Sequence, residues 1–596
     1  MRFSTPLLAA AVMTTKVHAA LRQYTLVVTH SNIAPDGVSR SAWLVNGTTP
    51  GPTIVADEGD QLSINVINKG DEPITIHWHG IEQLGTPWSD GVPGVTQYPI
   101  PVGKSFMYNW TATQMGYHWY HSHQHLQVDD GLRGDIYLRP KPGRQNPFSL
   151  ISSNSADIAA MKAAEQNPHK LFIYDWKHKT ADEYMNEWKR TMVEPLCLDD
   201  ILINGKGQVV CPSRQILDPV VNPTVGKATD KGCAFPNNTK VFPYGGDPNS
   251  VKPEIFYQCK NTTTELEVFQ VNPASKWAAF NVVNAASIWD LRVSIDNHTL
   301  YTFAADGSYI RPIQSELDKP VGDYTVRVAA SVLPQRLSGF AVLQYNTKAP
   351  IKRDLLDPPT KVKRAVTTTP APKNPYIDYA GQAIGSAREL DTIDIKPFPA
   401  NPPPKPSPDQ IVTIRLNAER TSELGWFLNN RTWTELPDSA TPLLFDYNQA
   451  SAIDSHLKFT SLKGRQSVDP SPSPVSTDPE FNTAWADLSR SIHKHGVKAW
   501  FLGWGSGAFP YNTVAEAQAA GLPGLNLVDP QYRDTFVTPP GLGGQNWIAF
   551  RFQSTDPGPM FMHCHIDPHL AVGMAVVLLE GIDQWPKTPS YYTSQH

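Results

Sequence analysis

The sequence predicts an all-β protein built from β-sandwich or Greek-key barrel units, and three patterns support this. Short alternating apolar and polar runs recur between Gly, Pro and Asn residues. In the run QLSINVIN, for example, Leu62, Ile64 and Val66 are expected on one face of a strand. Helical patterns are few, with candidates at 156–166 and 515–521. Evenly spaced short strands with turn signals are typical of such folds, and the chain also repeats itself, as described below.

Length and composition limit the class of protein. A chain of 596 residues is long enough for about three or four domains. Charged residues make up 18% of the chain, and the net charge is −5. The sequence has no long basic run, which argues against a nucleic-acid partner. Residues 1–19 combine an early Arg2, a short apolar run and a small-residue site, which predicts a cleaved secretory signal peptide. No stretch is long enough to predict a membrane span, so we expect a secreted protein.

Histidines recur as pairs with one residue between them, in the segments HWHG, HWYHSH, HKHG and FMHCHID. Because alternate side chains of a strand point the same way, each pair can share one face. Imidazole suits copper, and eight imidazoles are the right number for a cluster of three copper ions. The four pairs are His77 and His79, His121 and His123, His493 and His495, and His563 and His565.

The last pair has a cysteine at its centre. Cys564 should point away from His563 and His565, and His569 and Met574 follow five and ten residues later. A Cys, a His and a weak Met thioether are three of the four ligands of a blue-copper electron-transfer site, which also needs a second His. Electrons accepted at this site can cross a few covalent bonds to metals held by the flanking histidines. The pattern predicts one-electron oxidation coupled to a multi-electron acceptor.

The two ends of the chain look like diverged copies of one unit. Residues 121–132 align with 563–574 without a gap, and HWHG matches HKHG. The N-terminal copy lacks the Cys, His and Met of the mononuclear site, so one mononuclear centre and one shared cluster are expected. The aligned pairs are His121 and His563, Ser122 and Cys564, His123 and His565, Gln127 and His569, Gly131 and Gly573, and Leu132 and Met574.

These motifs, with DGLRGDIYL (130–138) and ILINGKG (201–207), resemble the multicopper oxidases of the laccase and ascorbate-oxidase group, and most closely the fungal ascorbate-oxidase-like laccases. The resemblance covers nearly the whole mature chain and implies three cupredoxin domains. Between the last two domains, a Pro-rich linker should be stiff and extended. The expected parts are the signal peptide (1–19), domain 1 (20–145), domain 2 (146–346), the linker (347–409) and domain 3 (410–596).

The resemblance also implies a role for each ligand and a total of four copper ions. Cys564, His569 and Met574 would bind the type 1 copper, and His77 and His493 the type 2 copper. The type 3 pair would be held by His79, His121, His123, His495, His563 and His565.

Two carboxylates are candidate proton handlers, because reducing dioxygen to water consumes protons. Asp90 lies eleven residues after His79, and Asp567 lies two after His565. The alternative is that each carboxylate only fixes a neighbouring imidazole or backbone group. His118 and His125 do not fit the pair pattern and are expected to support the site from nearby or to lie on the surface.

One expected ligand is missing. The family motif H-P-x-H-x-H-G begins with the second type 1 histidine, but here that position is Arg490, and arginine does not coordinate metals. The segment before it, 467–491, is rich in Pro and Ser. Three explanations are open: an error in the gene model that lost a short piece of exon or added translated intron, a chain with a damaged type 1 site, or recruitment of another histidine such as His456.

The remaining cysteines agree with export. Four cysteines allow three pairings, and two disulfides are plausible in an oxidising compartment. They are Cys197, Cys211, Cys233 and Cys259. Six N-x-S/T sequons are candidate glycosylation sites, namely Asn46, Asn109, Asn237, Asn261, Asn297 and Asn430.

The expected function is that of a secreted, monomeric, laccase-like oxidase. It would take single electrons from small phenols and reduce dioxygen to water, and coupling of the phenol radicals would suit pigment or melanin precursors. An axial thioether from Met574 predicts a low-to-medium potential and electron-rich substrates. The alternatives are an ascorbate oxidase or ferroxidase of the same family, or a copper-binding protein impaired by Arg490.

Overall fold

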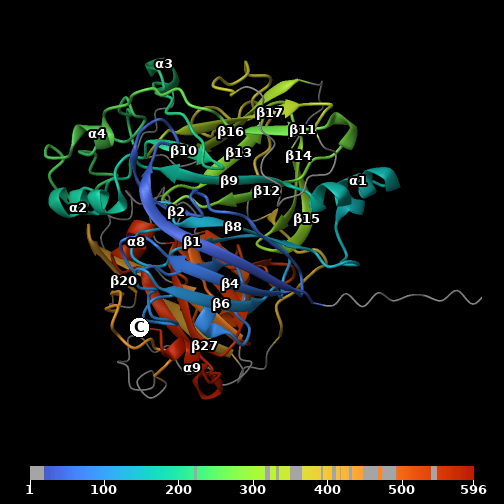
Figure 1. Cartoon of the computed structure of the whole chain (residues 1–596), viewed down its shortest axis with the longest axis vertical. Helices are drawn as coiled ribbons and strands as arrows, with labels where there is room; N and C mark the ends of the chain where they lie inside the picture. The colour runs from blue at the N-terminus through green and yellow to red at the C-terminus, as the bar shows by residue number, and fades with distance from the viewer. Residues whose placement is uncertain are drawn as a thin grey trace, which may run out of the picture.

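The structure is a computed structural model built mainly from strands, with short helices at the margins of the sheets (Figure 1). The all-β class predicted from the sequence is confirmed. The residues that the structure describes are 19–219, 225–315, 322–330, 334–349, 365–390, 394–405, 411–416, 418–428, 432–446, 467–472, 491–537 and 546–595. Arg490, His456, Asn430 and nearly all of the predicted signal peptide lie outside them.

Two four-stranded sheets form the N-terminal part of the molecule. The first has the order β2 (Arg40–Val45), β1 (Leu21–Ile33), β4 (Gln61–Asn68) and β6 (Ser105–Thr111). The second has the order β3 (Ile54–Asp57), β8 (Arg133–Arg139), β7 (Gly116–His121) and β5 (His77–His79), and η1 (Pro87–Ser89) lies outside the sheets. Leu62, Ile64 and Val66 are buried between the two sheets, as their alternation predicts.

The middle part carries most of the helices found in the described residues. Its sheets have the orders β10 (Asp200–Ile203), β9 (His169–Trp176), β12 (Phe280–Asn284), and β11 (Val268–Val271), β17 (Ser338–Tyr345), β16 (Asp323–Ala330), β13 (Leu291–Ile295), with a hairpin of β14 (Leu300–Ala305) and β15 (Ser308–Ser315). The helices are η2 (Phe148–Leu150), α1 (Ser155–Gln166), α2 (Ala181–Thr191), α3 (Arg214–Leu217), α4 (Pro253–Phe256) and η3 (Pro273–Ser275). Helix α1 confirms the predicted helix. Helix α2 was not predicted, although Thr180 and Glu183 form a capping box at its start.

The C-terminal part again holds two larger sheets. Their orders are β18 (Ile411–Leu416), β21 (Ser467–Pro472), β26 (Asn546–Gln553), β23 (Ala499–Ser506), β24 (Gln531–Arg533), and β25 (Thr535–Val537), β22 (Ser491–Lys494), β27 (Gly558–Cys564), β28 (Ala575–Glu580). A hairpin of β19 (Ala418–Ser422) and β20 (Gly425–Leu428) and the helices α7 (Val514–Ala519), α8 (Asp567–Ala571), η6 (Ile582–Gln584) and α9 (Ser590–Thr593) complete it. Helix α7 confirms the helix predicted near 515–521.

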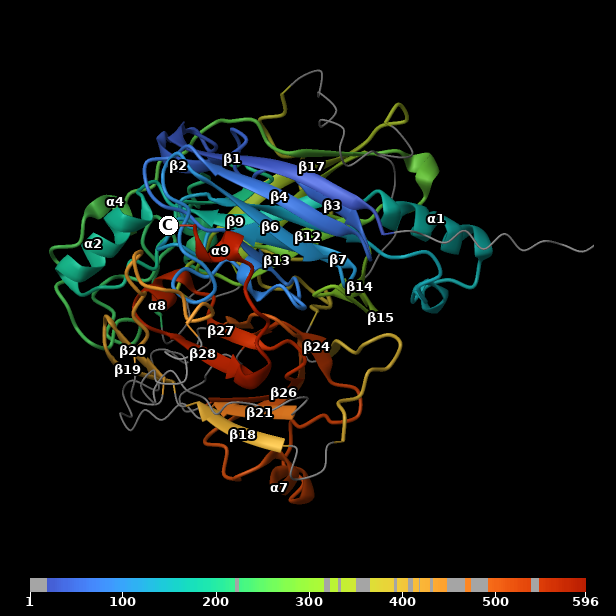
Figure 2. The ribbon, with the colours of Figure 1, turned by 60° about the horizontal axis from the view of Figure 1, so that its bottom comes forward.

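The N- and C-terminal parts are joined by direct contacts. Helix α9 packs under β6 in Figure 2, where the Tyr592 hydroxyl accepts a hydrogen bond from Nδ2 of Asn109. In the same region, the Tyr591 hydroxyl accepts one from the amide of Met107. These contacts hold the last strands of the chain against the first sheets. Within the described residues, no helix has the length and apolar character needed to cross a membrane.

Candidate metal centre

The four histidine pairs meet where the N- and C-terminal sheets face each other, and all eight side chains are buried. His77 lies opposite His121 in the β5–β7 pairing, and His493 lies opposite His563 in the β22–β27 pairing. Only the pair His77 and His79 lies wholly within a strand. The prediction of a shared strand face is wrong for the other three pairs, because β7, β22 and β27 each end before the second histidine.

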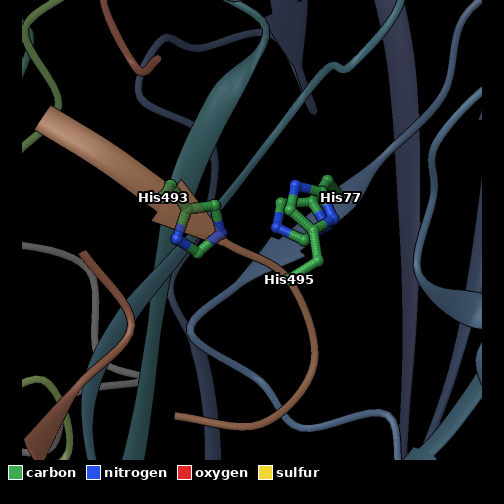
Figure 3. A group of neighbouring side chains, drawn as sticks. All are labelled: His77, His493 and His495. Carbon is green, nitrogen blue, oxygen red and sulfur yellow. The ribbon is translucent and has the colours of Figure 1, made fainter. Parts of the chain in front are cut away.

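The rings of the two ends pack closely together. The Nε2 atom of His563 lies 3.3 Å from Nε2 of His495 and 3.4 Å from Nε2 of His123. The ring centroids of His77 and His495 are 3.8 Å apart. Figure 3 shows these two rings stacked, with His493 on β22 beside them. Three groups of three imidazoles have ligand atoms within 4.8 Å of one another: His77, His493 and His495; His77, His79 and His121; and His123, His495 and His563.

The hydrogen bonds orient the imidazoles toward the centre of the cluster. The Nδ1 atoms of His77, His121 and His563 lie 2.7–2.9 Å from the backbone oxygens of Asp90, Ser122 and Cys564. Each Nδ1 therefore donates, and Nε2 keeps its lone pair. Within the described residues, no hydrogen-bond partner is found for Nε2 of His77, His121, His493 and His565.

His79 has the opposite orientation. Its Nε2 lies 3.3 Å from Oγ1 of Thr535, and its Nδ1 is the atom with no hydrogen-bond partner in the described part of the chain. Buried nitrogens without hydrogen bonds are rare unless an ion accounts for them. Three of the four candidate groups in the described residues consist of imidazoles only, which suits copper, and the fourth combines His79 and His493 with Asp534. The residues present therefore fit a copper cluster.

Burial favours the neutral form of most of these imidazoles. It is the largest cause of pKa lowering, and the neighbouring imidazoles lower each pKa further. Burial lowers the pKa of His565 to about 3. The pKa lies well below its ordinary value in His79, His121, His123, His493, His495 and His563. Neutral imidazoles at mildly acidic pH are ready to coordinate metal without losing a proton.

The two predicted carboxylates both lie beside the cluster. Oδ2 of Asp90 accepts a hydrogen bond of 2.8 Å from Nδ1 of His495, and its Oδ1 lies 3.3 Å from Nδ1 of His77. Asp90 thus contacts one histidine from each end of the chain. Oδ1 of Asp567 lies 3.9 Å from Nδ1 of His565. Burial, followed by the negative charge of nearby Asp129, raises the pKa of Asp567 well above its ordinary value.

The residues of the predicted mononuclear site lie together around Cys564. Its Sγ is 3.8 Å from Nδ1 of His569, and Met574 is buried in the same apolar cluster. Nε2 of His569 donates to Oε1 of Glu194 at 3.1 Å. Cys564 is not part of a disulfide. Arg490 and His456 lie outside the described residues, so all three explanations for the missing imidazole stay open.

The residues at the centre of each pair face away from the cluster ligands and have four different partners. Trp78 is fully buried in the N-terminal core. Oγ of Ser122 donates to Oε1 of Gln127 at 2.8 Å. Nζ of Lys494 lies 2.9 Å from Oε1 of Glu580 in a buried ion pair. The fourth, Cys564, faces His569 and the predicted mononuclear site.

Two carboxylates of the site had not been predicted from the sequence. Glu194 contacts His569 across 375 positions of the chain. Oδ1 of Asp534 lies 3.6 Å from Nε2 of His79 and 3.8 Å from Nδ1 of His493. A single acid outside any motif has no signal in the sequence, and only the pairing of β25 with β22 brings Asp534 into the site.

His118 and His125 take the supporting and surface positions expected of them. His118 is buried with Nε2 3.2 Å from the backbone oxygen of Met115, and burial lowers its pKa to about 4. The side chain of His125 is 58% exposed, with Nδ1 3.0 Å from Oε2 of Glu435.

The four middle cysteines form two disulfides, Cys197–Cys233 and Cys211–Cys259. Among the sequons, Asn46, Asn237 and Asn261 are exposed. Asn109 and Asn297 are half-buried, and Nδ2 of Asn109 is engaged with Tyr592. Asn430 lies outside the described residues.

Comparison with known proteins supports these observations. Family models described as multicopper oxidase match residues 27–143, 169–322 and 480–584. Laccase abr2 of Aspergillus fumigatus is 35% identical, with 96% of each chain covered. Multicopper oxidase VdtB of Byssochlamys spectabilis is 34% identical, covering 96% of this chain and 84% of the relative.

Solved structures show the same fold. A laccase from Botrytis aclada aligns with a TM-score of 0.64 at 23% identity, covering 97% of this chain and 90% of the other. Fet3p, a multicopper oxidase that functions in iron import, aligns with a TM-score of 0.63 at 17% identity, covering 96% and 94%. The three domains are therefore cupredoxin-like, and the chain belongs to the multicopper oxidase family.

Proposed function

We propose that this chain is a laccase-like oxidase that takes single electrons from electron-rich phenols and uses them to reduce dioxygen to water. One observation carries the proposal. Cys564 faces the mononuclear site, and its two sequence neighbours, His563 and His565, face the histidine cluster. The thiol that would receive the electron is therefore one residue away from ligands of the site that would use it.

The ligand assignment follows the geometry and the family. Cys564, His569 and Met574 would hold the type 1 copper, and His77 and His493 the type 2 copper. The type 3 ions would be held by His79, His121, His123, His495, His563 and His565. Four bound copper ions would supply one-electron transfer at one site and four-electron reduction of dioxygen at the other.

Asp90 and Asp567 are the residues best placed to handle protons. Asp90 accepts a hydrogen bond from His495, so it holds that imidazole in the orientation that directs Nε2 to the cluster. Asp567 is buried beside His565, and its raised pKa keeps a proton on the carboxyl group. A protonated acid beside the cluster is what a reaction that consumes protons requires.

The surroundings of His569 favour an organic reductant. Glu194, the carboxylate that contacts His569, is only 1% exposed, and its other oxygen forms an ion pair with Arg420 at 3.0 Å. A site for ferrous ion needs exposed oxygen ligands, and none of the candidate metal groups in the described residues contains Glu194. Together with an axial Met574, this favours electron-rich phenols, whose radicals then couple without the protein. Polymerising a pigment precursor would suit such an enzyme.

We also propose that the protein is secreted as a monomer. The predicted signal peptide, two disulfides and three exposed sequons support export. We further propose that domain 1 ends at residue 145, domain 2 at residue 346 and the linker at residue 409.

The test is an electron paramagnetic resonance spectrum of the copper-loaded chain, combined with copper analysis and dioxygen uptake on a simple phenol. We expect four copper ions per chain, a narrow hyperfine splitting from a thiolate-bound site, a normal type 2 signal and phenol-dependent uptake. A type 2 signal alone, without uptake, would show that the replacement at Arg490 has removed the electron-accepting site. The chain would then be a copper-binding protein and not an oxidase.

A further inference from the structure

A buried group of three charged side chains adjoins His569. Oε1 of Glu194 lies 3.1 Å from Nε2 of His569, and its Oε2 lies 3.0 Å from Nη2 of Arg420. The same Nη2 atom lies 2.9 Å from Oε2 of Glu423. Each of these side chains is 0–1% exposed. The group therefore joins three distant parts of the chain: the segment after α2, the β19–β20 hairpin and helix α8.

The guanidinium is enclosed by aromatic rings. Its centre lies 5.6 Å from the ring of Trp188, 5.5 Å from that of Tyr244 and 5.6 Å from that of Trp426. The Tyr244 hydroxyl also donates a hydrogen bond to the backbone oxygen of Arg420. Rings above a cation attract it and leave it little freedom to move. The position of Arg420 is fixed from several sides.

Such a group is expensive to bury. Removing ions from water costs several kcal/mol each, and a buried ion pair is often no more stable than an apolar replacement. Stability alone is thus a weak reason for charges here. Their alignment with His569 suggests a role at the metal site.

The carboxylate of Glu194 determines which nitrogen of the His569 imidazole carries the proton. An ionised carboxylate only accepts hydrogen bonds, so Nε2 of His569 must carry the proton. Nδ1 then keeps its lone pair, and it is the nitrogen that lies 3.8 Å from Sγ of Cys564. Partners of this kind fix both the tautomer and the ring orientation of a metal-binding histidine.

We propose that Arg420 is a positioning residue for the type 1 site. It anchors one oxygen of Glu194 so that the other holds His569 with Nδ1 facing Cys564. This inference rests on the proposed oxidase function, since it assigns His569 as a type 1 ligand. The guanidinium acts through Glu194 and does not itself touch the reacting atoms.

The competing explanation is that Arg420 only anchors the β19–β20 hairpin. Arg40 provides a matched control, because it is also a buried arginine paired with a carboxylate, at 2.5 Å from Asp130, and it lies 3.9 Å above the ring of Trp176. It is not part of the proposed copper site. Removing Arg40 should cost stability without changing the type 1 signal.

The experiment compares Arg420→Met, Arg420→Lys and Arg40→Met with the unmodified chain. Crystal structures of the copper-free proteins measure the distance from Nε2 of His569 to Glu194. Copper-loaded samples give the type 1 hyperfine splitting, the reduction potential, and kcat and KM separately. We expect Arg420→Met to lose the contact between His569 and Glu194, to change the splitting and potential, and to lower kcat by about 10–100-fold.

Arg420→Lys should recover part of each effect, because an ammonium keeps the charge without the planar fork. If Arg420→Met does not fold, Arg420→Lys carries the test, and an unchanged splitting and potential in it would overturn the proposal. An unchanged His569–Glu194 distance in Arg420→Met would do so as well. Because the copper-free structures need no functional metal site, they test the positioning role even if the unmodified chain forms no type 1 centre.

Discussion

The N-terminal turn (residues 121–133) and the C-terminal turn (residues 563–575) match at their two ends and differ in chemistry. Between the ends the backbones also differ, because residues 567–571 form α8, whereas His125 in the first turn has φ 48°. Each connects two antiparallel strands, with His121 opposite Arg133 in one and His563 opposite Ala575 in the other. In the first turn, the amide of residue 122 donates to the oxygen of Leu132 at 2.9 Å. In the second, the amide of residue 564 donates to the oxygen of Met574 at 3.0 Å.

The agreement extends to the sharpest bend of each turn. Gly131 has φ 108° and Gly573 has φ 104°, a region that side chains other than glycine avoid. A Cβ added to Gly573 would also lie 1.8 Å from Oγ1 of Thr432. Both turns therefore depend on glycine at the same step.

The difference lies in three side chains. In the N-terminal turn, Ser122 bonds directly to Gln127 at 2.8 Å, and the space between them is closed. In the C-terminal turn, Sγ of Cys564 and Nδ1 of His569 are 3.8 Å apart, which leaves soft donors facing a common point. The comparison teaches that two turns with matching ends hold both halves of the cluster, and that the residues between those ends decide whether the turn also carries the donors of the proposed type 1 site.

Cys564→Ser should have the largest effect, because it gives the C-terminal turn the residue that the N-terminal turn has at position 122. We expect phenol oxidation to fall by about 10³-fold or more, since one member of a unit that acts together is lost. The type 2 signal should persist, because the histidines facing the cluster are unchanged. Electron paramagnetic resonance and dioxygen uptake measure both. Retention of more than a tenth of the activity would contradict the assignment of Cys564.

The same comparison predicts a difference in pH dependence. Asp556 precedes His563 by seven residues, as Gln114 precedes His121, and it accepts a hydrogen bond of 3.0 Å from the amide of Gly85. Burial raises the pKa of Asp556 to about 7. Between pH 4 and 7 the unfolded chain has lost this proton and the folded chain has kept it, so the free energy of unfolding falls as pH rises.

Asp556→Asn should remove that dependence, which amounts to about 4 kcal/mol across the window. Urea denaturation of the copper-free protein at pH 4.5 and pH 7.5 measures it. In Asp556→Asn, residue 556 should add no loss of stability between pH 4.5 and pH 7.5. In the unmodified chain, Asp556 should lower the free energy of unfolding as the pH rises to 7.5. An identical pH dependence in both proteins would refute the prediction.

Asp90→Asn changes a residue beside the histidine cluster and leaves the C-terminal turn unchanged. The amide oxygen still accepts from His495, so copper should remain bound, but the carboxylate charge and its ability to carry a proton are lost. We expect kcat to fall by about 10–100-fold. The type 1 signal should be unchanged, which is the reverse of Cys564→Ser. Loss of the type 1 signal in this variant would show that the two sites are not separable as described.

Met574→Leu is the mildest change and copies Leu132 of the N-terminal turn. Without the axial thioether, the reduction potential of the type 1 site should rise, while copper content is unchanged. The effect on kcat/KM should stay below about tenfold, or about 1.4 kcal/mol. Redox titration against absorbance measures the potential. A fall in potential would show that Met574 does not lie on the copper axis.

The sequence was sufficient for the features that depend on local spacing. The gap-free alignment of 121–132 with 563–574 predicted that the two segments are copies of one unit, and their matching ends and glycines agree with it. It was not sufficient for contacts made by tertiary packing. Glu194 and Arg420 are brought to His569 by separate parts of the fold, and nothing near them in sequence marks that meeting. The ends of three strands were also predicted wrongly. In three of the histidine pairs, the second histidine lies beyond the last residue of its strand.

At four positions a single residue separates two histidines of the cluster in the chain. These residues are Trp78, Ser122, Lys494 and Cys564. Each of these side chains lies between two imidazoles of the cluster in the chain, yet faces an unrelated environment. Three of the four environments could therefore be redesigned without moving a ligand. A redox-active side chain or a reporter group placed at 78, 122 or 494 would be as near to the cluster along the chain as Cys564 is. The chain thus passes between cluster imidazoles at four positions, and the cysteine of the proposed type 1 site occupies one of them.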